Sequence, residues 1–131
     1  MTEATVCAIL QKDGKFLLVK RVYDPYKGRW CLPGGHVDEY ELAQSAVARE
    51  VKEETNLDFK PKFYKYFDEI LRAESWHAVV LIYTGQFSGE EKPGEDSGEV
   101  KWFTRDEIKK MNLAFNHKFI INDFIKNEEN K

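Results

Sequence analysis

One stretch, Leu32 to Leu57, constrains this chain more than any other part of it. It opens with a Pro-Gly-Gly turn and continues as a segment with helical periodicity. At about 100° per residue, its apolar side chains share one helix face, formed by Leu42, Ala43, Ala46 and Val47. Three carboxylates then enter the same angular sector: Glu50, Glu53 and Glu54. The face that should pack on the protein therefore changes from hydrocarbon to carboxylate halfway along the helix.

Three carboxylates on one helix face are unfavourable unless something compensates their charge. They repel one another at a spacing of i, i+3 and i+4, and they lie toward the helix C-terminus, where negative charge is disfavoured. Burying an unpaired carboxylate is costly as well. Oxygen-only ligands on a rigid helix suit a hard divalent cation, Mg²⁺ or alternatively Mn²⁺. The competing interpretation is an acidic helix end that is simply solvated.

The turn before the helix favours the metal interpretation, because Gly34 and Gly35 permit close approach of the main chain to a ligand. The whole stretch resembles the Nudix box, G-x5-E-x7-R-E-U-x-E-E-x-G-U, in which U is apolar. The matching residues are Gly35, Glu41, Arg49, Glu50, Val51, Glu53, Glu54 and Leu57. The last glycine is replaced by Asn56, the next best residue for a left-handed helix end, so we expect the departure to affect stability rather than chemistry.

The resemblance implies the fold and the reaction class. It predicts an α/β protein, a Nudix-like α/β/α sandwich with a central mixed sheet and a loop–helix–loop metal site. A chain of 131 residues suffices for one such domain, spanning 1–131. The implied reaction is hydrolysis of a phosphoanhydride in a nucleoside diphosphate linked to another group. We therefore expect an enzyme, a Nudix pyrophosphohydrolase, with a small-molecule nucleotide as its substrate.

The resemblance also suggests roles for individual residues. The metal ligands would be Glu50, Glu53 and Glu54, with the Gly35 carbonyl as a backbone ligand. Arg49 lies on the flank of this face, where it can orient a carboxylate through a charge-assisted hydrogen bond. We expect Glu41 to be structural, and the helix start is open between an Asp38–Glu41 capping box and a first turn nearer Leu42.

The general base is expected to be Glu53 or a glutamate from the acidic loop 88–99. Glu95 and Glu99 both precede the strand-like Val100–Phe103, and we prefer Glu99. Arg21, at the end of a strand, is a candidate for phosphate binding. Trp30 is a candidate for contacting the substrate, although packing is the commoner role for it and for the other aromatic candidates, Tyr64, Trp76 and Trp102.

The substrate is less constrained than the reaction. Segments 24–30 and 113–117 look similar to microbial ADP-ribose pyrophosphatases, which favours an ADP-ribose-like substrate, although the proline usual after the box in that group is absent from residues 62–80. The alternative is a nucleoside triphosphate pyrophosphatase of the nucleotide-sanitising, 8-oxo-dGTP type. A more remote alternative is a non-catalytic nucleotide-binding or regulatory Nudix domain, but such proteins typically lose glutamates from the box, and all three remain here.

Periodicity and turn residues predict the other elements. Residues 5–10 and 15–21 read as an antiparallel hairpin, 59–71 as a strand, and 76–87 as a strand central to a sheet. A short capped helix should run from Thr104 to Met111. A last helix should cover 115–126, with residues 127–131 frayed. Its buried stripe is predicted to contain Phe119, Ile120, Phe124 and Ile125.

Charge and cysteine content narrow the partners. A formal net charge of −3 disfavours general binding to nucleic acid backbones. Cys7 and Cys31 have no metal-binding spacing and should be reduced core residues, which fits a cytoplasmic protein. No signal peptide or membrane-spanning run is recognisable, so no membrane partner is expected. Whether the chain forms a homodimer stays open.

Overall fold

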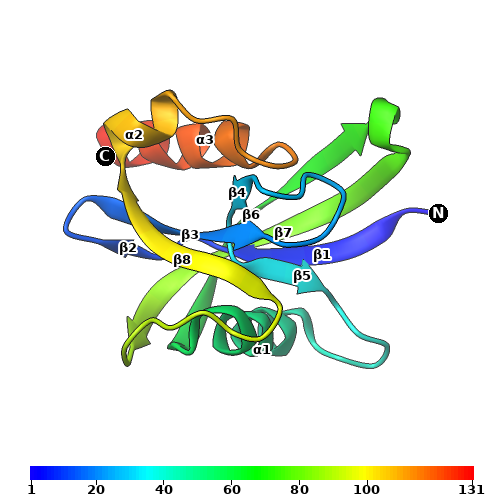
Figure 1. Cartoon of the computed structure of the whole chain (residues 1–131), viewed down its shortest axis with the longest axis horizontal. Helices are drawn as coiled ribbons and strands as arrows, with labels where there is room; N and C mark the ends of the chain where they lie inside the picture. Colours follow the sequence, from blue (N-terminus) through cyan, green and yellow to red (C-terminus); the bar gives the residue numbers. More distant parts are fainter.

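Two β-sheets lie between helical layers in the computed structural model, which describes all of residues 1–131 (Figure 1). The first sheet has the order β5-β1-β7-β6. Its strands are β1 (Glu3–Ala8), β5 (Gly34–His36), β6 (Asp58–Leu71) and β7 (Trp76–Ser88). Because β1 pairs with β7 in parallel and all other pairs are antiparallel, this is the mixed sheet that was expected. The predicted strands 59–71 and 76–87 are confirmed, and β7 is an interior strand.

The second sheet is antiparallel and is built around β3 (Lys15–Arg21). Its other strands are β2 (Gln11–Lys12), β4 (Trp30–Cys31) and β8 (Ser97–Thr104). The predicted hairpin between residues 5–10 and 15–21 is therefore wrong. Strand β1 has β5 on one edge and β7 on the other, so its residues cannot pair with β3. The predicted turn at Asp13 and Gly14 is present, but the strand that it joins to β3 is the short β2, extended by a hydrogen bond from the Leu17 N–H to the Leu10 carbonyl.

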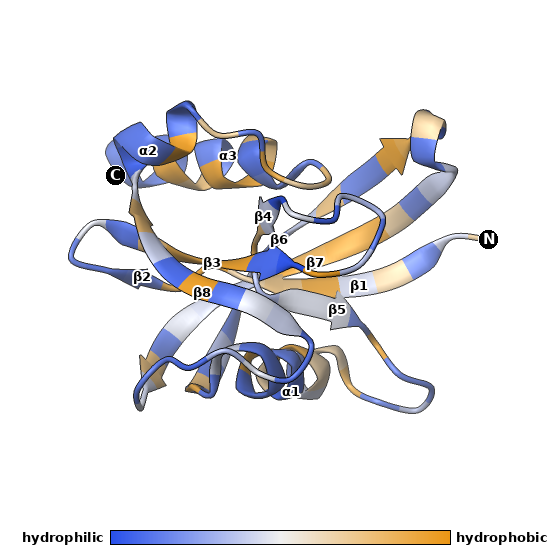
Figure 2. Cartoon of the chain, in the orientation of Figure 1, coloured by the Kyte–Doolittle hydropathy of each residue, from blue (hydrophilic) through white to orange (hydrophobic).

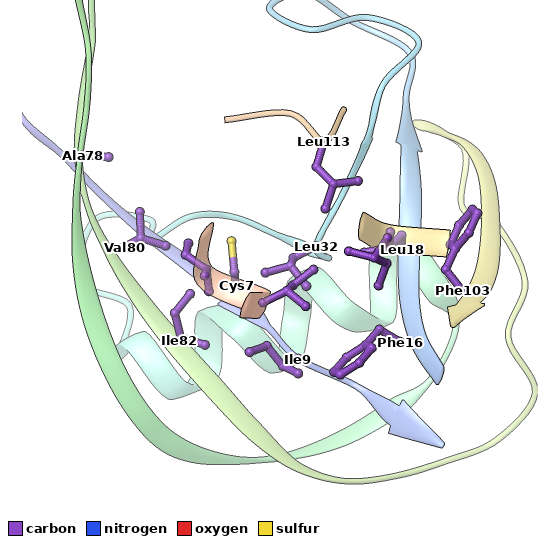
Figure 3. Close-up of a cluster of buried hydrophobic side chains, with 13 residues drawn as sticks. Cys7, Ile9, Phe16, Leu18, Leu32, Ala78, Val80, Ile82, Phe103 and Leu113 are labelled. Atoms are coloured by element: carbon purple, nitrogen blue, oxygen red, sulfur yellow. The ribbon is translucent and has the colours of Figure 1, made fainter. Parts of the chain in front are cut away.

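Successive side chains of the central strands point to opposite faces of the sheets, and the core is therefore divided into two layers. Val6 and Ala8 of β1 face α1 (Ala43–Thr55), whereas Cys7 and the following Ile9 face the opposite layer. Figure 3 shows this opposite layer, in which residues of β1, β3, β7 and β8 surround one apolar volume. Helices α2 (Arg105–Lys109) and α3 (His117–Glu129) cover it. The apolar runs lie in the strands between the helices, and the loops are mostly hydrophilic (Figure 2). The α/β/α sandwich is confirmed.

Helix α1 begins where the resemblance places it, directly after Leu42. The capping-box interpretation is wrong, because Asp38 and Glu41 close a turn before the helix, with the Asp38 N–H donating to Glu41 Oε1 at 3.0 Å. Leu42 itself is 71% exposed, so the buried stripe consists of Ala46, Val47 and Val51 instead. The helix ends as expected, since Asn56 has a left-handed φ of 67°.

The C-terminal region agrees with the sequence prediction only in part. Thr104 caps α2 through a capping box, as expected, although the helix ends at Lys109 rather than Met111. Phe119 does not belong to the buried stripe of α3, since it is 64% exposed and lies over the Phe67 ring at the sheet edge. The predicted fraying from residue 127 is also wrong. Helix α3 continues to Glu129, because the Asn127 side chain donates to the Tyr64 hydroxyl and Glu128 pairs with Arg105.

Candidate active site

The β5 turn brings main chain directly against two carboxylates of α1. The Gly34 N–H donates to Glu54 Oε2 at 3.2 Å, so the backbone already holds one of them. A Cβ atom at position 35 would lie 2.6 Å from the Glu50 carboxylate, so a larger residue would displace that carboxylate. At position 34 a Cβ atom would clash with the Val6 carbonyl oxygen of β1. The two glycines are thus explained by close packing on different partners, Gly34 on the β1 backbone and Gly35 on Glu50.

Glu50 and Glu54 lie one helical turn apart on the same face of α1, close enough for each charge to act on the other. Burial raises the pKa of Glu50, with Arg49 opposing the shift and the charge of Glu53 adding to it. Burial, followed by the charge of Glu50, raises the pKa of Glu54 well above its usual value. Both shifts mean that the two ionised carboxylates are unfavourable together in this position unless a cation accompanies them.

Arg49 supplies part of that positive charge and fixes the geometry. Its Nε and Nη2 donate to the two oxygens of Glu41 at 2.9 and 3.0 Å, a bidentate pair. Its Nη1 donates to Glu50 Oε1 at 2.9 Å and lies 3.3 Å from Glu53 Oε2. The hydrogen bonds from Arg49 lower the pKa of Glu41 to about 2, while Glu41 raises the pKa of Arg49. Glu41 therefore acts as the anchor of Arg49, in line with the structural role expected for it.

The third box glutamate is placed differently. The Glu53 side chain is 58% exposed and turns toward Arg49, because it lies on the solvent side of the helix face. No three His, Cys, Asp or Glu side chains are gathered closely enough to form a complete metal site in the structure. The predicted cluster of Glu50, Glu53 and Glu54 is thus not assembled in advance, and only Glu50 and Glu54 meet.

This donor set nevertheless fits a hard divalent cation. Two carboxylates with raised pKa values and the Gly35 backbone beside them offer oxygen ligands only. Such a set is suited to Mg²⁺ or Mn²⁺, which keep further positions for water and phosphate oxygen. Arg49 donates to both Glu50 and Glu53, so the Glu53 carboxylate lies near enough to Glu50 to become a third ligand of the cation.

The two candidate glutamates of the acidic loop, Glu95 and Glu99, lie in different surroundings, because only the part of the loop before Glu95 packs on α1. Backbone N–H groups of Lys92 and Gly94 donate to the carbonyls of Thr55 and Glu54, at the C-terminal end of α1. Glu95 follows this docked segment directly. Glu99, the preferred candidate, lies in β8 as an exposed side chain that pairs with Lys20 at 3.4 Å. No contact joins Glu99 to the carboxylates of α1 in this arrangement.

A cavity of about 340 Å³ continues from this carboxylate end toward the start of α3. Gly34, Gly35 and Glu54 line one part of it, and Arg21 lines its wall. The Arg21 Nε donates to the Pro25 carbonyl at 2.7 Å, and its guanidinium lies 4.9 Å from the centre of the Phe115 ring. The structure thus brings the predicted phosphate-binding Arg21 to the site.

Trp30, the other predicted substrate contact, does not line this cavity. Its ring packs edge-on against Phe103 at 4.8 Å and belongs to the core between β3 and α3. Adjacent residues of a strand point to opposite faces, and in β4 it is Cys31 that lines the cavity. Trp30 is thus half-buried against the core and lies outside the cavity lining, so its predicted contact with the substrate stays a prediction.

The far end of the cavity contains a buried carboxylate, Glu69, that the sequence did not reveal, and it lies beside Trp76, one of the aromatic candidates named from the sequence. Glu69 of β6 is 3% exposed and accepts hydrogen bonds from Trp76 Nε1 at 2.6 Å and from the Asn116 backbone N–H at 3.2 Å. Burial raises the pKa of Glu69. Trp76 and Phe115 line the cavity beside it. The only sequence signal was an acidic residue among the aromatic residues of a strand, which is too weak to indicate a site.

His117 lies between the two ends of the cavity as a neutral side chain. The Leu32 N–H donates to its Nδ1 at 3.0 Å, and its Nε2 lies 3.7 Å from the Cys7 sulfur. Burial, together with the charge of Arg21, lowers the pKa of His117 to about 3. Cys7 and Cys31 are both free and buried, as predicted, and burial raises the pKa of Cys31 to about 12.

Comparison with known proteins identifies the family. A family model described as the NUDIX domain matches residues 1–124. The chain belongs to the Nudix family. Within it, an ADP-ribose pyrophosphatase of Methanocaldococcus jannaschii is 37% identical over 123 residues, which cover 92% of this chain and 72% of that protein.

Solved Nudix structures share the fold. A MutT NUDIX hydrolase from Burkholderia pseudomallei is 31% identical with a TM-score of 0.83, and the match covers 91% of this chain and 95% of that one. The NUDIX domain of Shewanella oneidensis NrtR, complexed with ADP ribose, is 26% identical with a TM-score of 0.85, covering 97% and 88%. These similarities confirm the family and the fold. No helix of this Nudix chain is both long and apolar enough to cross a membrane.

Proposed function

We propose that this Nudix pyrophosphohydrolase cleaves the pyrophosphate linkage of ADP-ribose or a close analogue. The observation that carries the proposal is the continuous cavity, which joins Gly35 and Glu54 at one end to Trp76 and Phe115 at the other. A phosphate chain and a flat base need these two environments next to each other. The M. jannaschii relative and the ADP-ribose complex of the NrtR domain support the choice of ADP-ribose.

Hydrolases of this family depend on a divalent metal, and we infer that the metal here is Mg²⁺, with Mn²⁺ as a substitute. Glu50 and Glu54 would hold it, with the Gly35 carbonyl and Glu53 as further oxygen ligands. When bound, the ion neutralises the pyrophosphate charge and lowers the pKa of a water molecule.

The protein's own groups position the reaction around that site. Arg49 holds Glu50 through its hydrogen bond and keeps Glu53 within reach of the same carboxylate. Glu53, the most exposed of the three, would accept the proton of the attacking water, and Glu99 or the docked Glu95 is the alternative base. Arg21 would bind a phosphate oxygen, because its side chain lines the cavity between the α1 carboxylates and the Phe115 ring.

The second candidate is a nucleoside triphosphate pyrophosphatase of the nucleotide-sanitising type. The similarity to a MutT NUDIX hydrolase supports this second candidate. The non-catalytic alternative is disfavoured, since Glu50, Glu53 and Glu54 are all present. We also infer that residues 1–131 form one Nudix domain, because the family model spans nearly all of them. The buried thiols Cys7 and Cys31 support a cytoplasmic location.

A substrate panel at fixed Mg²⁺ tests this proposal. It would contain ADP-ribose, a nucleotide sugar, a dinucleoside polyphosphate, and canonical and oxidised nucleoside triphosphates, with products separated by chromatography. Preference for ADP-ribose with release of AMP is the expected result. Preference for a triphosphate, giving a monophosphate and pyrophosphate, would replace it with the second candidate. Absence of turnover with both Mg²⁺ and Mn²⁺ would contradict both enzyme functions.

A further inference from the structure

The far end of the cavity contains a buried carboxylate with no cation beside it. Glu69 is 3% exposed, and it forms no ion pair within 4.0 Å. Its two hydrogen-bond donors, the Trp76 indole and the Asn116 backbone N–H, are both neutral. A carboxylate in such a position is costly for a fold that does not use it. Its place in the cavity wall gives it access to a ligand.

The Glu69 carboxylate has unused acceptor capacity. Each of its oxygens accepts one hydrogen bond from the protein and retains a further lone pair. Asn116, whose backbone N–H is one of the two donors, does not itself line the cavity, so the open acceptor positions at this end are those of Glu69. A ligand that satisfies this end of the cavity must bring N–H or O–H groups.

The surroundings of Glu69 select a flat ligand. The Trp76 and Phe115 rings line the cavity next to it, with centroids 5.6 Å apart and planes inclined by 47°. Aromatic side chains of this kind bind nucleobases by stacking, and the stacking itself tolerates any base. Selectivity among bases must then come from polar groups at the edge of the rings. Two charged groups lie beside the rings: Glu69, and Arg21, whose guanidinium is 4.9 Å from the centre of the Phe115 ring. Of these two, only Glu69 accepts hydrogen bonds.

We propose that Glu69 is a specificity-determining residue, whose carboxylate accepts a hydrogen bond from the amino group of a nucleobase stacked on Trp76 and Phe115. The inference rests on the proposed function in taking adenine as that base. A carboxylate only accepts hydrogen bonds, so it favours a base with an amino group and disfavours one that presents a C–H there. The rest of the cavity, from Arg21 to Glu54, then receives the phosphates.

Two ligands that differ only in the amino group test the role of Glu69. Calorimetry would compare AMP with purine riboside 5′-monophosphate, and kinetics would compare ADP-ribose with its 6-desamino analogue. The wild-type protein should prefer the amino ligand by about 10- to 100-fold, because hydrogen bonds to charged groups are strong. In Glu69→Gln the ratio should fall to within about 3-fold, mainly through weaker binding of the amino ligand. Asp68→Asn, an exposed carboxylate next along β6, should keep the wild-type ratio.

A second variant covers the case in which Glu69→Gln fails to fold. Trp76→Phe keeps an aromatic ring but removes the N–H that occupies one Glu69 oxygen, so it should show at least the wild-type preference. Equal affinity of the wild-type protein for both ligands, an unchanged ratio in Glu69→Gln, or loss of preference in Trp76→Phe would overturn the role of Glu69. Hydrolysis of ADP-ribose without base discrimination would leave the proposed function intact. Discrimination in AMP binding without hydrolysis of ADP-ribose would contradict only the proposed function.

Discussion

The two ends of the cavity both contain buried carboxylates, but they are stabilised in different ways. At the α1 end, the charge of Glu50 acts on Glu54, and the two carboxylates are held by Arg49 and one backbone N–H respectively. At the other end, Glu69 stands alone and accepts hydrogen bonds from two neutral donors. Burial raises the pKa in all three cases.

The difference between the two ends indicates what each can bind. Two like charges in contact are stable at neutral pH only with a cation, so the α1 end is suited to a metal ion and phosphate. A single carboxylate with neutral donors needs no cation and can accept a further hydrogen bond, so the other end is suited to a neutral base. Charge pairing, more than burial, distinguishes a metal ligand from a recognition residue in this cavity.

The largest expected effect concerns the exposed carboxylate at the α1 end. Glu53→Gln removes one charge at nearly constant volume, and kcat for ADP-ribose hydrolysis at saturating Mg²⁺ should fall by about 10²- to 10⁴-fold. The fold should remain intact, because Glu53 is 58% exposed. Glu39→Gln, another exposed glutamate, is the matched control and should leave kcat unchanged. Activity of Glu53→Gln within a few-fold of wild type would refute the role of Glu53.

A smaller effect is expected on the free energy of unfolding in metal-free buffer at pH 7. Replacing a glutamate by glutamine should change it in opposite directions at the two ends of the cavity. Glu54→Gln should raise the free energy of unfolding by about 1 kcal/mol, because it removes a charge held against Glu50. Its amide can donate to Glu50 while its oxygen accepts from Gly34. Glu69→Gln should lower the free energy of unfolding by about 1–3 kcal/mol, because its NH₂ would face one of two N–H donors.

Denaturant unfolding of both variants in the presence of a chelator measures this contrast. If both substitutions shift stability in the same direction, the distinction between the repelling pair and the lone acceptor is wrong.

The last expected effect appears only at acidic pH and concerns His117, which lies between the two ends. Its pKa of about 3 is below the usual value of 6.5, so its neutral form is favoured in the folded protein. This contribution to stability is complete above pH 6.5 and is lost as the pH falls from 6.5 toward 3, because only the unfolded chain then takes up the proton. In His117→Gln, the free energy of unfolding should fall less steeply with decreasing pH. The difference in slope should correspond to the uptake of up to about one proton on unfolding.

Urea unfolding at several pH values measures the slope for His117→Gln. An unchanged slope in His117→Gln would contradict the lowered pKa of His117 in the folded protein.

Part of the α1 end of the cavity could be predicted from the sequence because it is local. One turn and one helix, within Gly34 to Glu54, place Glu50, Glu54, the glycines and Arg49 near one another, so spacing along the chain indicated them. The direction of Glu53 and the pairing of Glu99 with Lys20 depend on side-chain and tertiary contacts that spacing does not show.

The other end depends on tertiary structure. Glu69, Trp76 and Phe115 come from β6, β7 and the segment before α3, and no periodicity links them.

The errors in the fold prediction have the same origin. A helical wheel gives the direction of a side chain but not the extent of the layer that covers it, so Leu42 and Phe119 were assigned to buried stripes although both are exposed. The hairpin prediction failed because apolar runs do not show that β7 occupies one edge of β1 in parallel.

Calorimetric titration of Mn²⁺ into the wild-type protein and two variants tests the contrast between the ends most directly. Both variants, Glu54→Gln and Glu69→Gln, remove one buried charge by the same chemical change. We predict that Glu54→Gln weakens Mn²⁺ binding by at least about 10-fold, since one ligand of a two-carboxylate pair is lost, whereas Glu69→Gln binds Mn²⁺ as the wild-type protein does. Equal binding by wild type and Glu54→Gln, or equal loss in both variants, would contradict the assignment of the α1 end as the metal site.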